Sequence, residues 1–172
     1  LVQDVLVTPP YVRISRMIRD ISATDILVGN KHTNLRQMVE QELTSEDVAS
    51  HVQEIRFREI NQQQVRATEL TLQDFAYTTT VSDEHFLQWV TADNKIAGFC
   101  RLSLPHWDKL TSGACDVSAD ELLVQPGQAM IRELHVYGQA LSLGSEGMSA
   151  QHQGLGQKLL AKASSIATDT GY

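Results

Sequence analysis

The chain has 172 residues, of which 42% are hydrophobic and 20% charged, a composition typical of a folded globular protein. Its formal net charge is −7, from 14 basic and 21 acidic residues. No apolar run approaches the roughly 18 residues of a membrane span, and the first residues lack the basic region of a signal peptide. Two cysteines, Cys100 and Cys115, exclude a disulfide-rich module and a four-cysteine zinc site. We therefore expect a cytoplasmic protein without a membrane partner.

The charge is distributed unevenly along the chain. Residues 1–36 carry five basic and three acidic residues, whereas the remainder carries nine basic and eighteen acidic ones. A basic leading segment on an acidic body can meet a polyanion at one end only. Its basic residues are Arg13, Arg16, Arg19, Lys31 and Arg36.

The leading segment is predicted to be a strand over residues 1–7, stopped by two prolines, and then a helix over residues 11–20. In that helix Arg13, Arg16 and Arg19 recur every three residues and lie along one side. This side is either a solvated surface or a ridge that contacts phosphates.

The rest of the chain alternates further helical and strand patterns. Helices are predicted from Asn34 to Leu43, after Thr44, and from Gly154 to a cap at Gly171. Residues 105–128 are predicted to be an irregular loop or insertion. Residues 55–60 alternate apolar and charged side chains, which predicts a half-buried strand, and further strands are predicted over residues 69–80 and 129–137. The strongest strand signal is a hairpin that runs from residues 84–91 through a turn at 93–95 to residues 96–104.

The most informative motif joins the last strand to the last helix. A helix start exposes unpaired N–H groups and partial positive charge, and glycine lets an anion approach the backbone closely. The pattern Q-x-x-G-x-G at this junction therefore predicts a site for a phosphate-bearing ligand. Its residues are Gln151, His152, Gln153, Gly154, Leu155, Gly156, Gln157 and Lys158.

This pattern resembles the pyrophosphate-binding motif of the GNAT acetyltransferases. Together with the sequence IRELHVYG at residues 131–138, it resembles the acetyltransferase domain of the Elongator catalytic subunit family, which modifies the wobble uridine of tRNA. The sequence PPYVRISRMIRDI at residues 9–21 is similar to the end of that family's radical-SAM domain. Residues 34–36 and 55–60 look like the linker between the two domains.

The resemblance implies an α/β (α+β) fold, with a mixed GNAT sheet flanked by helices and incomplete at its C-terminus. It implies that residues 1–27 end the radical-SAM domain, residues 28–62 form a linker and residues 63–172 form the acetyltransferase domain. It also implies acetyl-CoA as cofactor, hydrolysed in a tRNA-dependent way to supply an acetyl group to C5 of uridine 34. Leu134, His135 and Val136 would then offer backbone to the pantetheine, and residues 151–158 would hold the pyrophosphate.

The chain departs from that family in three respects. It has no C-x-x-x-C-x-x-C motif, so a [4Fe–4S] cluster and S-adenosylmethionine are expected only in a domain preceding it. It stops at Tyr172, before the next GNAT strand and a tyrosine-bearing segment, which indicates a fragment. His51 has no neighbouring cysteine, so no metal site is predicted.

The sequence leaves alternatives open for the catalytic residue and for the partners. Glu133 is a candidate general base, but in a regular strand Glu133, His135 and Tyr137 share one face, so Glu133 and His135 can instead form a structural pair. Arg132, Leu134 and Val136 would share the other face. The alternative functions are a GNAT N-acetyltransferase acting on protein lysine or a small amine, and a non-catalytic assembly module. A homodimer or a larger complex is possible within either function.

Overall fold

The computed structural model describes residues 1–17, 23–29, 31–32, 34–61, 63–114, 123–137 and 154–172. The chain folds as two units, Leu1–Glu59 and Ile60–Tyr172. The predicted division into a domain end, a linker and an acetyltransferase domain stays a prediction.

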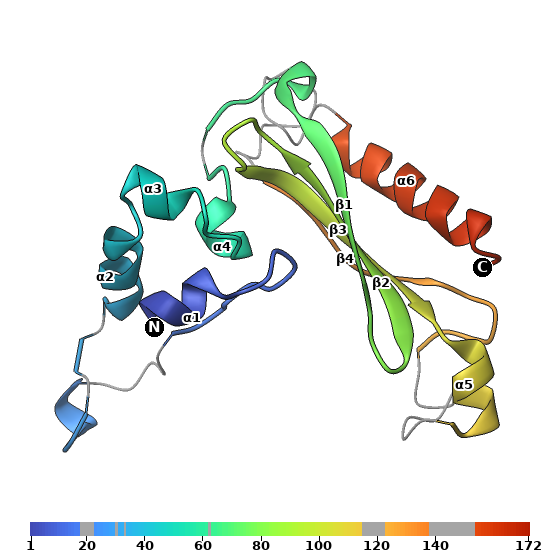
Figure 1. The fold of residues 1–172 in the computed structure, drawn as a ribbon, viewed down its shortest axis with the longest axis horizontal. Helices are drawn as coiled ribbons and strands as arrows, with labels where there is room; N and C mark the ends of the chain where they lie inside the picture. The colour runs from blue at the N-terminus through green and yellow to red at the C-terminus, as the bar shows by residue number, and fades with distance from the viewer. Residues whose placement is uncertain (18–22, 30, 33, 62, 115–122, 138–153) are drawn as a thin grey trace. The chain divides into compact units, whose positions relative to one another are not determined.

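The first unit contains short helices (Figure 1), and apolar side chains form a small core among them. The core consists of Val5, Val39, Leu43 and Val52, all at most 5% exposed. The prediction of a helix from Asn34 is confirmed, as is that of a helix start after Thr44. The helices are α1 (Val2–Leu6), the 3₁₀ turn η1 (Ala23–Asp25), α2 (Leu35–Glu42), α3 (Glu46–Ala49) and α4 (Ile55–Arg58).

Two strand predictions in the first unit are wrong. Residues 2–6 form α1, because Val2, Val5 and Leu6 share one helical side and pack on the core. Residues 55–58 form α4, whose N-cap Glu54 accepts a hydrogen bond from the N–H of Phe57 at 2.8 Å. A capped start therefore overrides the alternating pattern of residues 55–60.

The second unit is built on one four-stranded sheet in the order β1-β2-β3-β4. The predicted hairpin and both flanking strands are confirmed, and the class is α+β. All three pairings among the described strands are antiparallel, where a mixed sheet was expected. A parallel pairing needs a crossover to a further strand, and no strand follows the last helix within the described residues. The strands are β1 (Thr71–Thr78), β2 (Ser82–Val90), β3 (Ile96–Pro105) and β4 (Met130–Val136).

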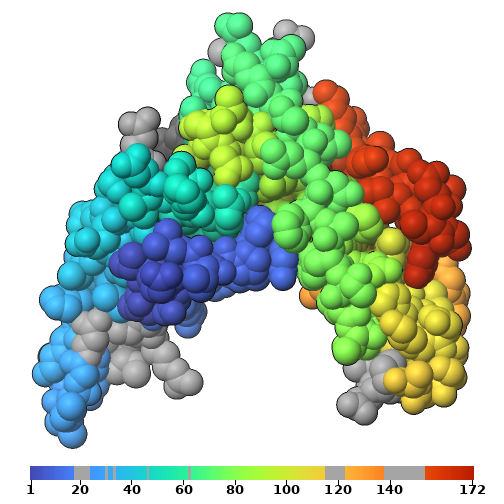
Figure 2. All heavy atoms as spheres, in the orientation of Figure 1, coloured from blue at the N-terminus to red at the C-terminus, as the bar shows by residue number. Residues whose placement is uncertain are grey.

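One long helix, α6 (Leu155–Asp169), covers one face of this sheet (Figure 1). It packs on β2, β3 and β4 through Leu159 and Ala163, which lie against Leu87 and Cys100, and all four are 0% exposed. In the space-filling view, the edge strand β1 (green) lies toward the viewer and α6 (red) lies on one side of the sheet (Figure 2).

The connections around the sheet correct one further expectation. The segment predicted to be irregular contains α5 (Trp107–Ser112), which ends at Gly113 with a positive φ of 71°. A short 3₁₀ turn, η2 (Ala67–Glu69), precedes β1. The predicted cap of the last helix is confirmed, since Gly171 follows α6 with φ 91°.

Candidate functional site

Strand β4 is an edge strand of the described sheet. Its main-chain N–H and C=O groups point alternately toward β3 and toward the outer edge. Tyr137 donates its N–H to the carbonyl of Ala97 at 2.9 Å, and His135 lies opposite Phe99. In an antiparallel ladder, the residues between such bonded pairs turn their N–H and C=O groups the other way. Leu134 and Val136 therefore direct their main-chain groups to the outer edge of β4. His135, predicted with them, has its main chain in the ladder.

The start of α6 has the features of an anion site. Gly154 is the N-cap with φ 66°, a left-handed conformation that glycine adopts without strain. The N–H of Lys158 bonds the carbonyl of Gly154 at 3.1 Å, so the amides of the three preceding residues lie before the first intrahelical bond. They carry the positive end of a 15-residue helix. Gln151, His152 and Gln153 lie outside the described residues.

The start of α6 packs on the face of β4 that carries the side chains of Leu134 and Val136, the same residues whose main chain is directed to the outer edge. A Cβ on Gly156 would lie 3.6 Å from a methyl of Val136 and 3.9 Å from a methyl of Leu134. Leu155 is 0% exposed and anchors this turn in the core. The two glycines therefore serve the fold as well: Gly154 permits the left-handed cap, and Gly156 lies where helix and strand approach. An elongated ligand along β4 would bring its phosphates to the helix start.

Lys158 lies at the same end of the sheet. Its ammonium is 6.0 Å from the ring centroid of Trp89 in β2, within range of a cation–π interaction. The indole Nε1 of Trp89 is buried and has no hydrogen-bond partner among the described residues. Gln157 is exposed, with its side-chain oxygen 3.8 Å from the position of a Cβ on Gly154.

A β-bulge changes the predicted facing of the residues in β4. Glu133 is opposite Arg101, but Ile131 is opposite Leu102, so Arg132 is the extra residue. The alternation predicted for Arg132 and Glu133 is therefore wrong. Arg132 extends to Glu84 at 3.3 Å, on the sheet face that also carries Glu133. The sequence holds no signal for this bulge, because either residue fits a strand.

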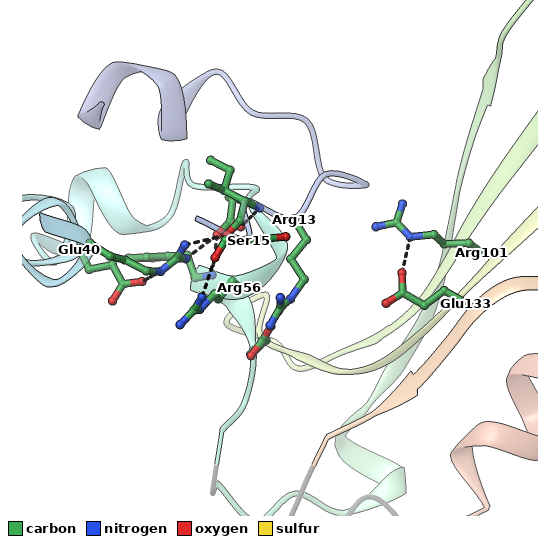
Figure 3. Close-up of polar contacts among 11 residues, drawn as sticks. Arg13, Ser15, Glu40, Arg56, Arg101 and Glu133 are labelled. Atoms are coloured by element: carbon green, nitrogen blue, oxygen red, sulfur yellow. Dashed lines mark hydrogen bonds and ion pairs between the residues drawn. The ribbon is translucent and has the colours of Figure 1, made fainter. Parts of the chain in front are cut away.

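Glu133 and His135 have separate neighbours. The carboxylate of Glu133 accepts a hydrogen bond from Nε of Arg101 at 2.9 Å (Figure 3). The His135 ring stacks on Phe99 with centroids 5.9 Å apart and lies 4.7 Å from Tyr137. The structural pairing of Glu133 with His135 is thus replaced by an Arg101–Glu133 ion pair, which sequence reasoning missed.

The arginine ridge predicted near the N-terminus is not helical over the described residues 11–17. Arg13 pairs with Glu59 at 2.9 Å, and Arg19 lies outside the described residues. Arg36 pairs with Glu40 at 2.6 Å and with the buried Glu54 at 3.3 Å, while Arg16 and Lys31 are exposed. Two of the predicted RNA-contacting residues therefore take part in ion pairs within the first unit.

Two buried side chains in the part of the chain that the structure describes have a pKa that burial shifts strongly. Burial raises the pKa of the Cys100 thiol to about 11 and lowers the pKa of the Arg58 guanidinium to about 10. Within the part of the chain that the structure describes, no three His, Cys, Asp or Glu side chains gather as metal ligands. No described helix combines the length and apolarity that crossing a bilayer requires.

Over most of its length the chain is similar to proteins of known function. The chain is 40% identical over 165 residues to a tRNA uridine(34) acetyltransferase of Dehalococcoides mccartyi, covering 94% of this chain and 34% of that protein. It is 33% identical to Elongator complex protein 3 of Schizosaccharomyces pombe, over 92% of this chain and 28% of that one. The predicted resemblance is confirmed. The chain spans about a third of the length of these relatives.

Solved structures agree on the fold. The archaeal Elp3 of Methanocaldococcus infernus, with an N-terminal deletion, matches with a TM-score of 0.73 at 24% identity. The match covers 98% of this chain and 39% of that one. No family model matches the chain.

Proposed function

We propose that this chain is the acetyl-CoA-binding part of an acyltransferase that modifies uridine 34 of tRNA. The relatives named tRNA uridine(34) acetyltransferase, similar over 94% of the chain, support the reaction class. The single observation that supports the cofactor is the contact of the start of α6 with Leu134 and Val136, the two residues of β4 whose main chain is directed to the outer edge.

The described residues fit an acyl carrier of this kind. The main chain of Leu134 and Val136 provides amide donors and acceptors to the pantetheine along the outer edge of β4. The amides that begin α6, between Gly154 and Lys158, hold the diphosphate. When bound, acetyl-CoA supplies the acetyl group that is released by hydrolysis in the presence of tRNA.

Glu133 is proposed as the general base. Its carboxylate is 42% exposed and is oriented by Arg101, so it can accept the proton of an attacking water. The ion pair fixes the direction of the carboxylate. Arg101 itself lies over the rings of Phe86 and Phe99, at 5.3 and 5.5 Å from their centroids, which holds the pair in place.

The partners of the proposed enzyme are tRNA and acetyl-CoA, in the cytoplasm. The basic residues of the first unit, above all the exposed Arg16 and Lys31, are the proposed tRNA contacts, together with Arg13, Arg19 and Arg36. A [4Fe–4S] cluster and S-adenosylmethionine belong in this proposal to a domain outside this chain. Assembly as a homodimer or in a larger complex remains part of the proposal.

The cofactor site is tested by Gly154→Asp against Gly154→Asn. Both side chains tolerate a left-handed backbone better than most and both cap helices, so the variants differ by one negative charge. We expect calorimetry with a non-hydrolysable acetyl-CoA analogue to show at least about tenfold weaker binding for Gly154→Asp than for Gly154→Asn. Equal affinities would remove the helix start from the site.

A second measurement tests the reaction. In the proposal, acetyl-CoA hydrolysis rises when tRNA is added to the full protein. Acetylation of a lysine or amine acceptor without RNA would identify an N-acetyltransferase instead. Absence of any heat with the analogue would favour a non-catalytic assembly module.

A further inference from the structure

Arg132 is held in an unusual way at the bulge of β4. Its Nη1 donates to Oε2 of Glu84, which lies two strands away in β2 and is 3% exposed. The other oxygen, Oε1, accepts hydrogen bonds from the hydroxyls of Ser82 at 2.7 Å and Ser103 at 2.6 Å. Both oxygens of the buried Glu84 carboxylate thus have hydrogen bonds, and among the described residues its one cationic partner is Arg132.

Stability alone does not account for this arrangement. Burying a carboxylate is unfavourable, and a buried ion pair often contributes no more to stability than apolar side chains of the same volume. The cluster formed by Glu84, Ser82 and Ser103 does have a geometric effect. It fixes the direction of the Arg132 side chain, which is itself 51% exposed.

An arginine fixed in this way is suited to an oxyanion. The guanidinium has five N–H donors in a rigid fork, and its bond to Glu84 uses only Nη1 among the described contacts. The half-exposed side chain can therefore present other donors of the fork to a phosphate. Because Glu84 already orients the fork, little side-chain entropy is lost when the phosphate binds.

The position of Arg132 indicates which phosphate it binds. It directly precedes Glu133, the proposed base, and lies on the sheet face opposite the side chains of Leu134 and Val136, against which α6 begins. The diphosphate of the acyl carrier is assigned to the α6 start, on that other face. A phosphate at Arg132 therefore belongs to a second ligand that approaches the reaction centre, which for an RNA substrate is its sugar-phosphate backbone.

We propose that Arg132 binds a backbone phosphate of the RNA substrate beside Glu133, and that Glu84 with Ser82 and Ser103 is the positioning group that aims it. This inference rests on the proposed function, because it takes RNA as the acceptor. Arg132 is then a substrate-contacting residue on the sheet, separate from the basic residues of the first unit.

The test is the salt dependence of tRNA binding to the full protein, measured by fluorescence anisotropy. Arg132→Gln is expected to weaken binding about tenfold and to reduce the slope of log affinity against log salt by about 0.7 to 0.9. Arg132→Lys keeps the charge and is expected to keep the slope, with an intermediate affinity. The matched control Arg66→Gln removes an exposed arginine of the same unit, in the turn before β1, and is expected to change neither quantity.

Glu84→Gln tests whether Glu84 positions Arg132, because the substitution preserves the shape of the side chain while replacing the ion pair with a weaker neutral hydrogen bond. We expect weaker tRNA binding with an unchanged salt slope, since the cation is retained but no longer aimed. Thermal unfolding of each variant shows whether the sheet is intact. If Arg132→Gln does not fold, the slope and affinity of Arg132→Lys and Glu84→Gln decide the proposal.

Acetyl-CoA binding distinguishes the possible failures. Unchanged tRNA affinity and slope in Arg132→Gln, with wild-type protein binding tRNA, would overturn this inference alone. A loss of acetyl-CoA affinity in Arg132→Gln would assign the phosphate to the cofactor and also overturn it. Wild-type protein that binds acetyl-CoA but no tRNA would overturn the RNA acceptor itself, and wild-type protein that binds neither would overturn the proposed function.

Discussion

Gly98 of β3 and His135 of β4 approach so closely that a Cβ on Gly98 would lie 2.9 Å from the carbonyl oxygen of His135. The same Cβ would lie 3.3 Å from Cα of Val136. Real Cβ atoms do not come this near to backbone, so any side chain here must push β4 outward. The glycine thus sets the position of the strand that carries the proposed pantetheine contacts.

The first prediction compares two glycine-to-alanine variants. Gly98→Ala is expected to destabilise the second unit by about 1 to 3 kcal/mol and to weaken acetyl-CoA binding, because β4 must move. Gly156→Ala places its methyl at ordinary contact distance and is expected to stabilise α6 by up to about 1 kcal/mol. Chemical denaturation measures the stability of both variants, and calorimetry measures their affinity for acetyl-CoA. A Gly98→Ala protein as stable as wild type would show that β3 and β4 are not held this closely.

The second prediction concerns Glu133. Glu133→Gln is expected to slow tRNA-stimulated acetyl-CoA hydrolysis at least about 100-fold while leaving acetyl-CoA affinity within about twofold. Arg101→Gln, which breaks the same ion pair but keeps the carboxylate, is expected to have a smaller effect on the rate. Single-turnover kinetics provide the comparison. If the two variants lose the same activity, the pair is structural and Glu133 is not the base.

The third prediction separates the contribution of Arg36 to stability from the effect of an exposed cation of the first unit on tRNA binding. Glu54 is 0% exposed and accepts hydrogen bonds from the main chain of Ile14 and Phe57 as well as from Arg36. Arg36 also donates to the carbonyl of Ile14 at 2.8 Å. Arg36→Gln is expected to cost about 3 to 5 kcal/mol of stability, because it leaves a buried carboxylate without its cation.

The matched control is Lys31→Gln. Lys31 is exposed, so its replacement is expected to leave stability within about 0.5 kcal/mol and to lower tRNA affinity and salt slope. Thermal melts and salt titrations of both variants give the comparison. A stable Arg36→Gln protein would contradict the role assigned to the Glu54 carboxylate.

The fourth prediction concerns pH. Cys100 is 0% exposed, and burial raises its pKa from 9.0 to about 11. Below pH 9 the thiol is protonated in both the folded and unfolded states. Between pH 9 and 11 the unfolded chain loses this proton while the folded protein keeps it. The free energy of unfolding therefore falls by about 3 kcal/mol over this range.

Cys100→Ala provides the reference for this measurement, because it removes the thiol and leaves other groups that titrate at high pH, such as Arg58 and Tyr172. Denaturation at several pH values should give curves that converge as the pH rises. Parallel curves for the two proteins would mean that the thiol ionises as readily folded as unfolded. The same burial predicts that Cys100 resists alkylation in the native protein at pH 8.

The fold was predictable where an element is long and its sequence signal is sustained. The hairpin joins two long apolar strands, β2 and β3, across a short turn, and α6 has an apolar stripe that extends over 15 residues. The short segments were ambiguous, because five or six residues fit both periods. Residues 2–6 and 55–58 are helical for reasons outside the pattern itself, namely packing on a core and a carboxylate cap.

The candidate site was predictable only in the part whose chemistry depends on neighbouring residues in the sequence. Gly154 and Gly156 stand in a motif whose chemistry is local, so the helix start could be located from the sequence. The pairing of Arg132 with Glu84 links positions 48 residues apart and depends on an irregularity of register. Nothing in the local sequence distinguishes a bulged residue from a regular one.

The partly buried indole of Trp89 gives the protein an intrinsic optical reporter. Its ring lies 6.0 Å from the ammonium of Lys158 in the first turns of α6, and its Nε1 is shielded from solvent. Indole emission responds to nearby charge, so a dianion arriving at this helix start should shift the fluorescence of Trp89. With the second tryptophan, Trp107, replaced by phenylalanine, occupancy could be followed in real time without a label.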